Sequence, residues 1–129
     1  MTNQKFVIAI PTYRRPKIIV EKTLKLLKNY NIPNDQIIIF IKDQMEMNDY
    51  KDIVANYNLV LTGADGIMET RNFLQSWFYY ETEYDNVLFM DDDIDSLYNM
   101  DKPLENFKEF VEFAFRETKN LNLNLWGVS

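Results

Sequence analysis

Four carboxylates crowd into the short segment Asp91-Asp92-Asp93-Ile94-Asp95, directly after the apolar run Val87–Met90. Side chains at alternate positions of this segment can converge, and like charges so close repel one another unless a cation or hydrogen bonds hold them. Oxygen-only ligands suit Mg²⁺ or Mn²⁺ better than zinc. The segment therefore predicts a divalent metal site. The alternative is a solvated acidic turn, and Asp95 is favoured as a cap for the chain that follows.

Two residue types that often carry catalysis are missing from the chain. It has no cysteine and no histidine, which excludes disulfides, thiolate zinc sites, cysteine nucleophiles and histidine triads. Any metal or acid–base chemistry must therefore rest on carboxylates. No apolar run is long enough to span a membrane, and the N-terminus lacks a signal-peptide pattern, so a cytoplasmic protein is expected.

The chain of 129 residues fits a single domain, residues 1–129, with one hydrophobic core. Its net charge of −6 is unevenly placed. Residues 1–45 hold eight basic against three acidic residues, and residues 46–129 hold six against seventeen. This pattern is compatible with an anion site facing a metal site, or with two differently solvated surfaces.

Short apolar runs predict strands that are buried on both faces, at residues 6–10, 37–41 and 87–90, with further strands at 58–62 and 121–128. Helical spacing predicts helices from Pro16 to about residue 30, over 45–57, over 67–83 and from Pro103 onward. In the third of these helices, Met68, Leu74 and Phe78 are among the residues expected to face inward. The alternation of strands and helices predicts an α/β fold, a Rossmann-like three-layer sandwich with a mostly parallel sheet.

In such a sheet, ligands bind beyond the carboxyl ends of the strands. Four loops would meet there, at residues 11–15, 42–44, 63–72 and 91–95. They supply an aromatic ring, three arginines and an isolated acid besides the carboxylate cluster: Tyr13, Arg14, Arg15, Arg71 and Asp43. This set matches a nucleoside diphosphate with a metal ion on its phosphates.

Four motifs, in order, resemble those of nucleotide-sugar glycosyltransferases of the type-A fold, especially family 2. Pro11-Thr-Tyr-Arg-Arg-Pro16 is similar to that family's opening "PTYNRP" segment, and Asp43 stands where its base-contacting acid lies. Gly66-Ile-Met-Glu-Thr-Arg71-Asn72 resembles its "G…ARN" element, and Asp91-Asp92-Asp93 its "DXD" metal motif. The likeness covers the nucleotide-binding half of the family's domain.

The resemblance implies a metal-dependent transfer of a sugar from a nucleotide-diphosphate donor, with a UDP-sugar preferred, to an acceptor hydroxyl. Asp93 would be the direct metal ligand, with Asp91 contributing or contacting the ribose. The nucleotide would be bordered by Pro11, Thr12, Tyr13, Arg14, Asp43, Gly66, Arg71, Asp91 and Asp92. The acceptor would be a saccharide or, as in related phage enzymes, a hydroxymethylated base in DNA.

In that family the catalytic base lies well after the metal motif. No acidic residue follows Glu117, so the catalytic base is expected beyond Ser129, and the chain is expected to be the amino-terminal part of a longer transferase.

Two other functions compete with this interpretation, and a third is excluded. In phosphoryl-transfer enzymes of the haloacid-dehalogenase kind, a strand also ends in an Asp-x-Asp pair. In those enzymes the pair is expected at the first strand, whereas here it follows a later one. A non-catalytic acidic interaction domain with a vestigial metal site would show no metal-dependent nucleotide binding. A calcium loop starting at Asp91 is excluded, because Ser96 replaces the turn glycine and Lys102 stands where a bidentate glutamate is required.

Overall fold

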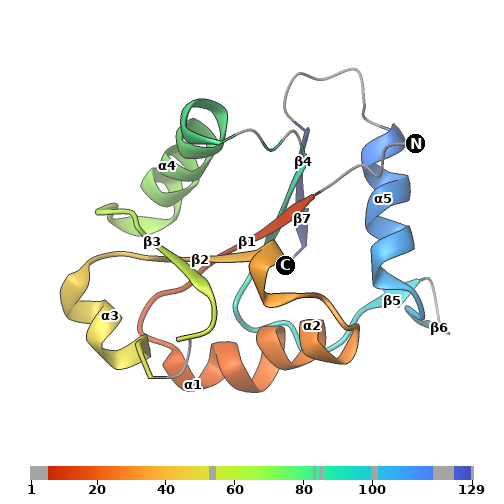
Figure 1. The fold of residues 1–129 in the computed structure, drawn as a ribbon, viewed down its shortest axis with the longest axis horizontal. Coiled ribbons are helices and arrows are strands. Elements are labelled where there is room, and N and C mark those ends of the chain that lie inside the picture. Colours follow the sequence, from red (N-terminus) through yellow and green to blue (C-terminus); the bar gives the residue numbers. More distant parts are fainter. Residues whose placement is uncertain are drawn as a thin grey trace.

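The protein is described by a computed structural model that covers residues 6–52, 55–82, 84, 86–99, 102–117 and 124–128. Five parallel strands form one sheet in the order β3-β2-β1-β4-β7 (Figure 1). Their bounds are Val7–Pro11 for β1, Ile37–Ile41 for β2, Asn58–Leu61 for β3, Asn86–Met90 for β4 and Asn124–Val128 for β7. The predicted α/β class with a parallel sheet is confirmed, and the strand order is compatible with a Rossmann-like fold.

Strands β1 and β2 are apolar throughout because both of their faces are covered. In β2, Ile37, Ile39 and Ile41 belong to one hydrophobic cluster, while Ile38 and Phe40 belong to a second cluster on the opposite face. The same alternation divides β1, as the two-residue period of a strand requires. A continuous apolar run in the sequence is therefore the mark of a strand between two layers.

One face of the sheet is covered by most of the helices. These are α1 (Pro16–Ile19), α2 (Lys25–Asn29), α3 (Gln44–Tyr50) and α5 (Phe107–Glu117). Ile19, Leu27, Tyr50 and Phe115 are among the residues that pack into this layer. The single helix predicted after Pro16 is interrupted, because its middle, Val20–Leu24, is a turn of π-helix, η1.

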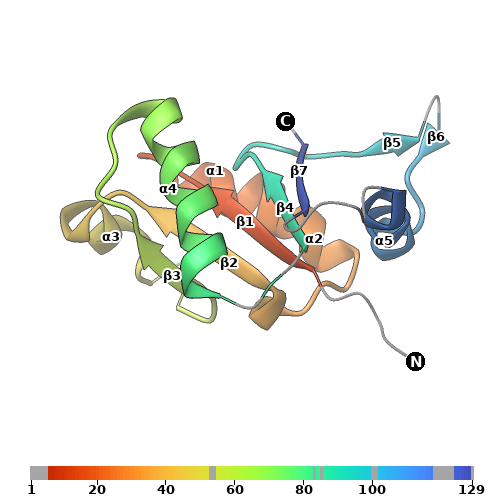
Figure 2. The ribbon, with the colours of Figure 1, turned by 90° about the horizontal axis from the view of Figure 1, so that it is seen from above.

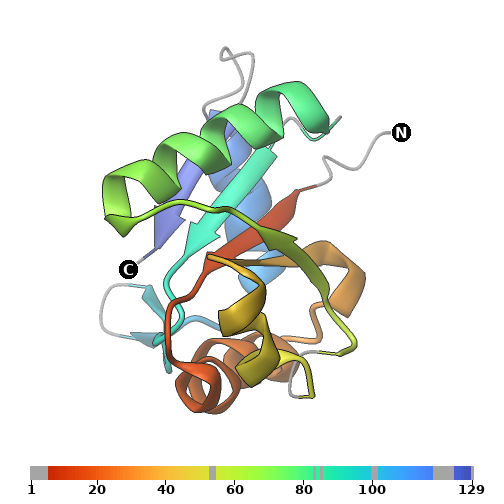
Figure 3. The ribbon, with the colours of Figure 1, turned by 90° about the vertical axis from the view of Figure 1, so that its left-hand side faces the viewer.

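Within the described ranges, α4 (Gly66–Glu81) is the helix that covers the opposite face, across β2, β1 and β4 (Figures 2 and 3). Leu74 and Phe78 are buried against the sheet, as predicted. Met68, however, is 79% exposed, because the first turn of α4 lies at the edge of the covered region; its predicted inward position is wrong. No helix in the part of the chain that the structure describes has the length and apolar character needed to cross a membrane.

Two further boundaries differ from the sequence-based prediction. Pro103 does not open a helix. It belongs to β6 (Lys102–Pro103), which pairs antiparallel with β5 (Tyr98–Asn99). Helix α5 begins at Phe107, and the side chain of the preceding Asn106 accepts a hydrogen bond from the Glu109 amide. The predicted helix at 45–57 ends at Tyr50. A short 3-10 turn, η2 (Asn34–Gln36), precedes β2. Residues 121–123 of the predicted last strand lie outside the described residues.

Candidate functional site

A cavity of about 580 Å³ opens at the carboxyl ends of β1, β2, β3 and β4 and beside the first turns of α4. Its volume lies in the range of small-molecule sites. The strand ends are held in register by backbone hydrogen bonds that continue beyond them, from the Thr12 amide to the Phe40 carbonyl (3.0 Å) and from the Thr62 amide to the Ile41 carbonyl (2.8 Å). The cavity is lined by Pro11, Thr12, Tyr13, Arg15, Phe40, Lys42, Thr62, Ala64, Asp65, Gly66, Ile67, Thr70, Arg71, Asp91, Asp92 and Asp93.

Most of the predicted site residues therefore share one cavity. Those that line it are Pro11, Thr12, Tyr13, Gly66, Arg71, Asp91, Asp92 and Asp93. Arg14 and Asp43 are not among the lining residues. Arg15, which follows Arg14 in the same loop, is among the lining residues instead.

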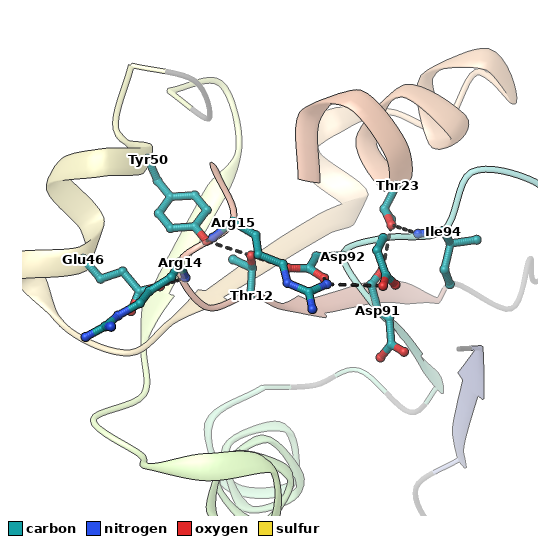
Figure 4. A network of polar contacts seen from close by, with 10 residues as sticks. Thr12, Arg14, Arg15, Thr23, Glu46, Tyr50, Asp91, Asp92 and Ile94 are labelled. Atoms are coloured by element: carbon teal, nitrogen blue, oxygen red, sulfur yellow. Dashed lines mark hydrogen bonds and ion pairs between the residues drawn. The ribbon is translucent and has the colours of Figure 1, made fainter. Parts of the chain in front are cut away.

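Asp92 is a buried carboxylate that ties the loop after β4 to the loop after β1 (Figure 4). Its Oδ2 accepts a hydrogen bond from the Thr12 hydroxyl (2.7 Å). The Thr12 hydroxyl also contacts the Tyr50 hydroxyl (2.8 Å), and the Tyr50 oxygen accepts from the Arg15 amide (2.8 Å). Burial raises the pKa of Tyr50, so its hydroxyl stays protonated. One continuous row of hydrogen bonds therefore joins α3, β1 and β4.

Arg15 balances the negative charge of the acidic loop. Its Nη1 lies 3.2 Å from Asp92 Oδ1 and 3.2 Å from Asp93 Oδ2. Attraction to Asp92, followed by the hydrogen bond to Asp93, raises the pKa of the guanidinium further above its ordinary value. Asp93 and Arg15 are each about half exposed, whereas Asp92 is not. This part of the site therefore combines a buried carboxylate, a half-exposed one and a cation between them.

Asp91 carries negative charge that its surroundings do not fully balance. Partial burial, followed by repulsion from Asp93 and Asp92, raises the pKa of its carboxyl group, and Arg71 and Arg15 oppose that shift. Asp95 does not join the cluster: it forms an ion pair with Lys22 (3.5 Å) and lies outside the cavity lining.

The donor set was tested against the predicted Mg²⁺ or Mn²⁺. Among the residues that the structure describes, no three acidic side chains are grouped so that they form a complete metal cage. Asp91 and Asp93 nevertheless face one cavity beside two arginines. Mg²⁺ is usually held by one or two carboxylates together with substrate phosphates and water. A metal site at Asp91 and Asp93 would therefore need further ligands, such as the oxygens of a bound diphosphate, and a metal ion at these two residues stays a prediction.

The acidic loop is positioned by the π-helical turn η1. Thr23, fully buried in η1, donates a hydrogen bond to the Asp91 carbonyl (2.6 Å) and accepts one from the Ile94 amide (2.9 Å), as Figure 4 shows. A π-helical turn inserts an extra residue into a helix and is frequent near functional sites. Here it brings one hydroxyl into contact with both sides of the acidic loop, so the loop has a fixed course.

The cavity lining also includes the aromatic ring of Tyr13, which lies beside two cations. The Tyr13 ring is half exposed, with the Arg14 guanidinium 5.0 Å and the Lys42 ammonium 6.0 Å from its centre. Lys42 forms an ion pair with Asp65, which raises the pKa of the lysine. An exposed ring beside donors and acceptors is suited to stacking on a flat, polar ligand.

The two predicted residues outside the cavity lining have structural contacts. The Asp43 side chain caps α3 by accepting a hydrogen bond from the Glu46 amide (2.9 Å). The Arg14 amide donates to the Glu46 carboxylate, and Arg14 has a left-handed backbone with φ of 53°. Their contacts with a nucleotide remain predictions.

Several residues of the site were not singled out from the sequence. Tyr50, Thr23, Lys42 and Asp65 fall into this group. Thr23 lies within the apolar stripe of a predicted helix, where a threonine reads as a tolerated core residue. Lys42 immediately follows the predicted strand at 37–41, and Asp65 lies two residues before the predicted helix at 67–83. Their positions at the ends of predicted elements are a usable signal. No family model, curated protein or solved structure gave a match to this chain.

Proposed function

We propose that this chain binds a nucleoside-diphosphate sugar together with a divalent cation and transfers the sugar to an acceptor hydroxyl. The observation that carries the proposal is the convergence on one cavity of an exposed tyrosine ring, two arginines and the acidic pair Asp91 and Asp93. Three of the four sequence motifs that resemble family 2 glycosyltransferases supply residues to that same cavity, and the fourth, Asp43, does not.

Each group has a task in this proposal. The Tyr13 ring stacks on the base, and Arg71 and Arg15 neutralise the phosphates through paired N–H donors. Asp91 and Asp93 hold the cation, which when bound stabilises the negative charge that develops on the departing diphosphate. The base that deprotonates the acceptor is not assigned, and the acceptor class, saccharide or modified DNA, follows from the resemblance alone.

The first experiment measures ligand-dependent stability. The protein is unfolded thermally with UDP, GDP, ADP or pyrophosphate, each with and without Mn²⁺. A ligand at 100 times its dissociation constant raises the free energy of unfolding by about 2.7 kcal/mol. We expect at least one diphosphate to stabilise the protein, and to do so more strongly with Mn²⁺. Failure of every diphosphate to stabilise it would refute the proposal.

The metal contribution is isolated by paired variants. Asp93→Ala should abolish the part of the stabilisation that depends on Mn²⁺. Asp95→Ala is the matched control, because Asp95 lies two residues further on and outside the cavity lining. Radiolabelled UDP-sugars then test transfer to saccharides and to DNA containing hydroxymethylated bases, while release of phosphate from small esters would favour a phosphoryl-transfer enzyme instead.

A further inference from the structure

The guanidinium of Arg15 lies where a cation would neutralise the acidic loop. Its Nη1 is equally distant, at 3.2 Å, from a carboxylate oxygen of Asp92 and one of Asp93. It also lines the cavity, together with Asp91 and Arg71. Arg15 therefore contacts a residue that is proposed to bind the metal, and it lines the cavity that is proposed to hold the phosphates.

The two carboxylates hold this guanidinium differently. Asp92 is buried and is fixed by the Thr12 hydroxyl, and the backbone of Arg15 is fixed by Tyr50. Asp93 is half exposed, and Arg15 provides the one side-chain contact found for it within the described residues. The contact to Asp92 can therefore persist while the contact to Asp93 breaks.

We propose that Arg15 is a tethered counter-cation that a divalent ion displaces from Asp93, and that its freed guanidinium face then binds the diphosphate. This inference rests on the proposed function and adds a competition inside the site. A guanidinium and a divalent ion repel each other, so they cannot share the Asp93 carboxylate at low cost. Guanidinium groups pair well with phosphate oxygens because their N–H donors form a planar fork.

The competition has a consequence that an ordinary phosphate-binding arginine lacks. Removing the charge of Arg15 should strengthen binding of the metal alone and weaken binding of a diphosphate to the protein that already holds the metal. A purely structural arginine would weaken both, and an arginine that only contacts phosphate would leave direct metal binding largely unchanged.

The test uses Arg15→Gln and the matched control Lys17→Gln, which removes the same charge from an exposed position outside the cavity lining. Free Mn²⁺ is measured by electron paramagnetic resonance without nucleotide, and pyrophosphate binding by calorimetry at a saturating concentration of Mn²⁺. For Arg15→Gln we expect severalfold tighter Mn²⁺ binding and about tenfold weaker pyrophosphate binding, the loss expected for a charged hydrogen bond. Lys17→Gln should change both affinities less than twofold.

Unchanged or weaker Mn²⁺ binding by Arg15→Gln overturns the inference, even if the wild-type protein binds diphosphates and the proposed function holds. A wild-type protein that binds neither Mn²⁺ nor pyrophosphate overturns both. Arg15→Lys covers the case in which Arg15→Gln does not fold: it keeps the charge but lacks the planar fork, so pyrophosphate binding should fall while Mn²⁺ binding stays near the wild-type value. Tighter Mn²⁺ binding by Arg15→Lys than by Lys17→Gln also counts against direct charge competition.

Discussion

Three consecutive aspartates meet three different environments at the end of β4. Asp92 points into the protein and is held by Thr12 and Arg15. Asp91 faces the cavity with a raised pKa, and Asp93 is exposed beside Arg15. The middle residue is thus structural, while its neighbours remain available for a ligand.

The first prediction concerns the buried tie between the two loops. Thr12→Val removes the hydroxyl while keeping the shape of the side chain, so Tyr50 and Asp92 both lose a partner. Leaving buried polar groups unpaired costs about 1–3 kcal/mol. We expect that loss in the free energy of unfolding, measured by urea denaturation. Thr12→Ser, which keeps the hydroxyl, should lose less than half as much, and equal losses would show that the hydroxyl is not the cause.

The second prediction is a pH dependence that comes from Asp91. Its folded-state pKa is raised, so the folded protein binds this proton more tightly than the unfolded chain does. The ionised carboxylate therefore destabilises the fold above the raised pKa, and this cost disappears as the pH falls below the ordinary value near 3.8. Asp91→Asn should be more stable than the wild type at neutral pH, and the difference should shrink on acidification. Urea denaturation across that pH range checks this, and a difference that grows toward low pH would contradict it.

At the residue scale the sequence predicts which loops meet at the cavity, but not which residues of each loop line it. A cluster of aspartates after an apolar run identifies the site, because strand ends of a parallel sheet meet at one edge. Which aspartate is buried depends on Thr12 and Tyr50, which lie far away in the sequence. Arg15 rather than Arg14 lines the cavity because Arg14 takes a left-handed backbone, a conformation that its residue type does not suggest.

Among the helical elements, η1 has the clearest influence on the site. Its Thr23 contacts the acidic loop on both sides, at the Asp91 carbonyl and the Ile94 amide. An α-helix with the predicted regular spacing would present a different side chain at this point. The site thus depends on a local irregularity in the first helical segment.

The third prediction tests that dependence. Thr23→Val removes both hydrogen bonds and should cost about 1–3 kcal/mol of stability because the groups involved are buried. The amide of Ile94 should then exchange with solvent faster than neighbouring amides of β4, as measured by NMR hydrogen exchange. Thr23→Ser should restore its protection. Unchanged exchange at Ile94 in Thr23→Val would show that the loop is held by other contacts.

The fourth prediction separates two roles of Asp43. As the cap of α3, its replacement by alanine should cost about 1 kcal/mol, and Asp43→Ser, which can still cap, should cost little. If Asp43 also contacts the base, Asp43→Ser should nevertheless weaken nucleotide binding. Urea denaturation together with calorimetry of the nucleotide that binds best measures the two effects independently. Full affinity in Asp43→Ser would restrict Asp43 to its role in the helix.

Elements buried on two faces were the most predictable, because their apolar runs admit few other interpretations. Helix boundaries were less so. The sequence predicts a helix start at Pro103, because that position favours proline. Edge strands also accept proline, and the pairing of Pro103 with Tyr98 places it in a strand. The π-helical turn has no signature in the residue pattern, because it depends on which carbonyl each amide meets in the folded chain.

At the scale of the whole molecule, the two faces of the sheet are covered unequally. Most of the described helices lie on one face, and α4 covers the other. The contact of α4 depends on few large side chains, among them Phe78, which is buried, and Trp77, whose ring meets that of Phe40 edge-on at 5.4 Å. Because α4 also carries Gly66 and Arg71, its attachment supports one wall of the cavity.

The fifth prediction follows from this arrangement. Phe78→Ala should lower the free energy of unfolding by about 3–5 kcal/mol, as large-to-small changes in a core do. Tyr80→Ala, on the same helix at a position that is 78% exposed, should change it by less than about 0.5 kcal/mol. Urea denaturation of the two variants compares them directly. Equal losses would mean that α4 is not held by its buried face.

The row of hydrogen bonds from Arg15 to Asp92 has a direction, and this direction limits how a ligand can lie in the cavity. The Tyr50 oxygen accepts a hydrogen bond from the Arg15 amide. The Thr12 hydroxyl donates its single hydrogen to the Asp92 carboxylate, so in the contact between Tyr50 and Thr12 the Tyr50 hydroxyl is the donor. The Thr12 hydroxyl can therefore only accept a hydrogen bond from a ligand. Under the proposed function we therefore expect an N–H or O–H donor of the ligand beside Thr12 and the phosphate oxygens beside the arginines. The direction of these hydrogen bonds would thus set how the proposed nucleotide sugar is oriented relative to β1.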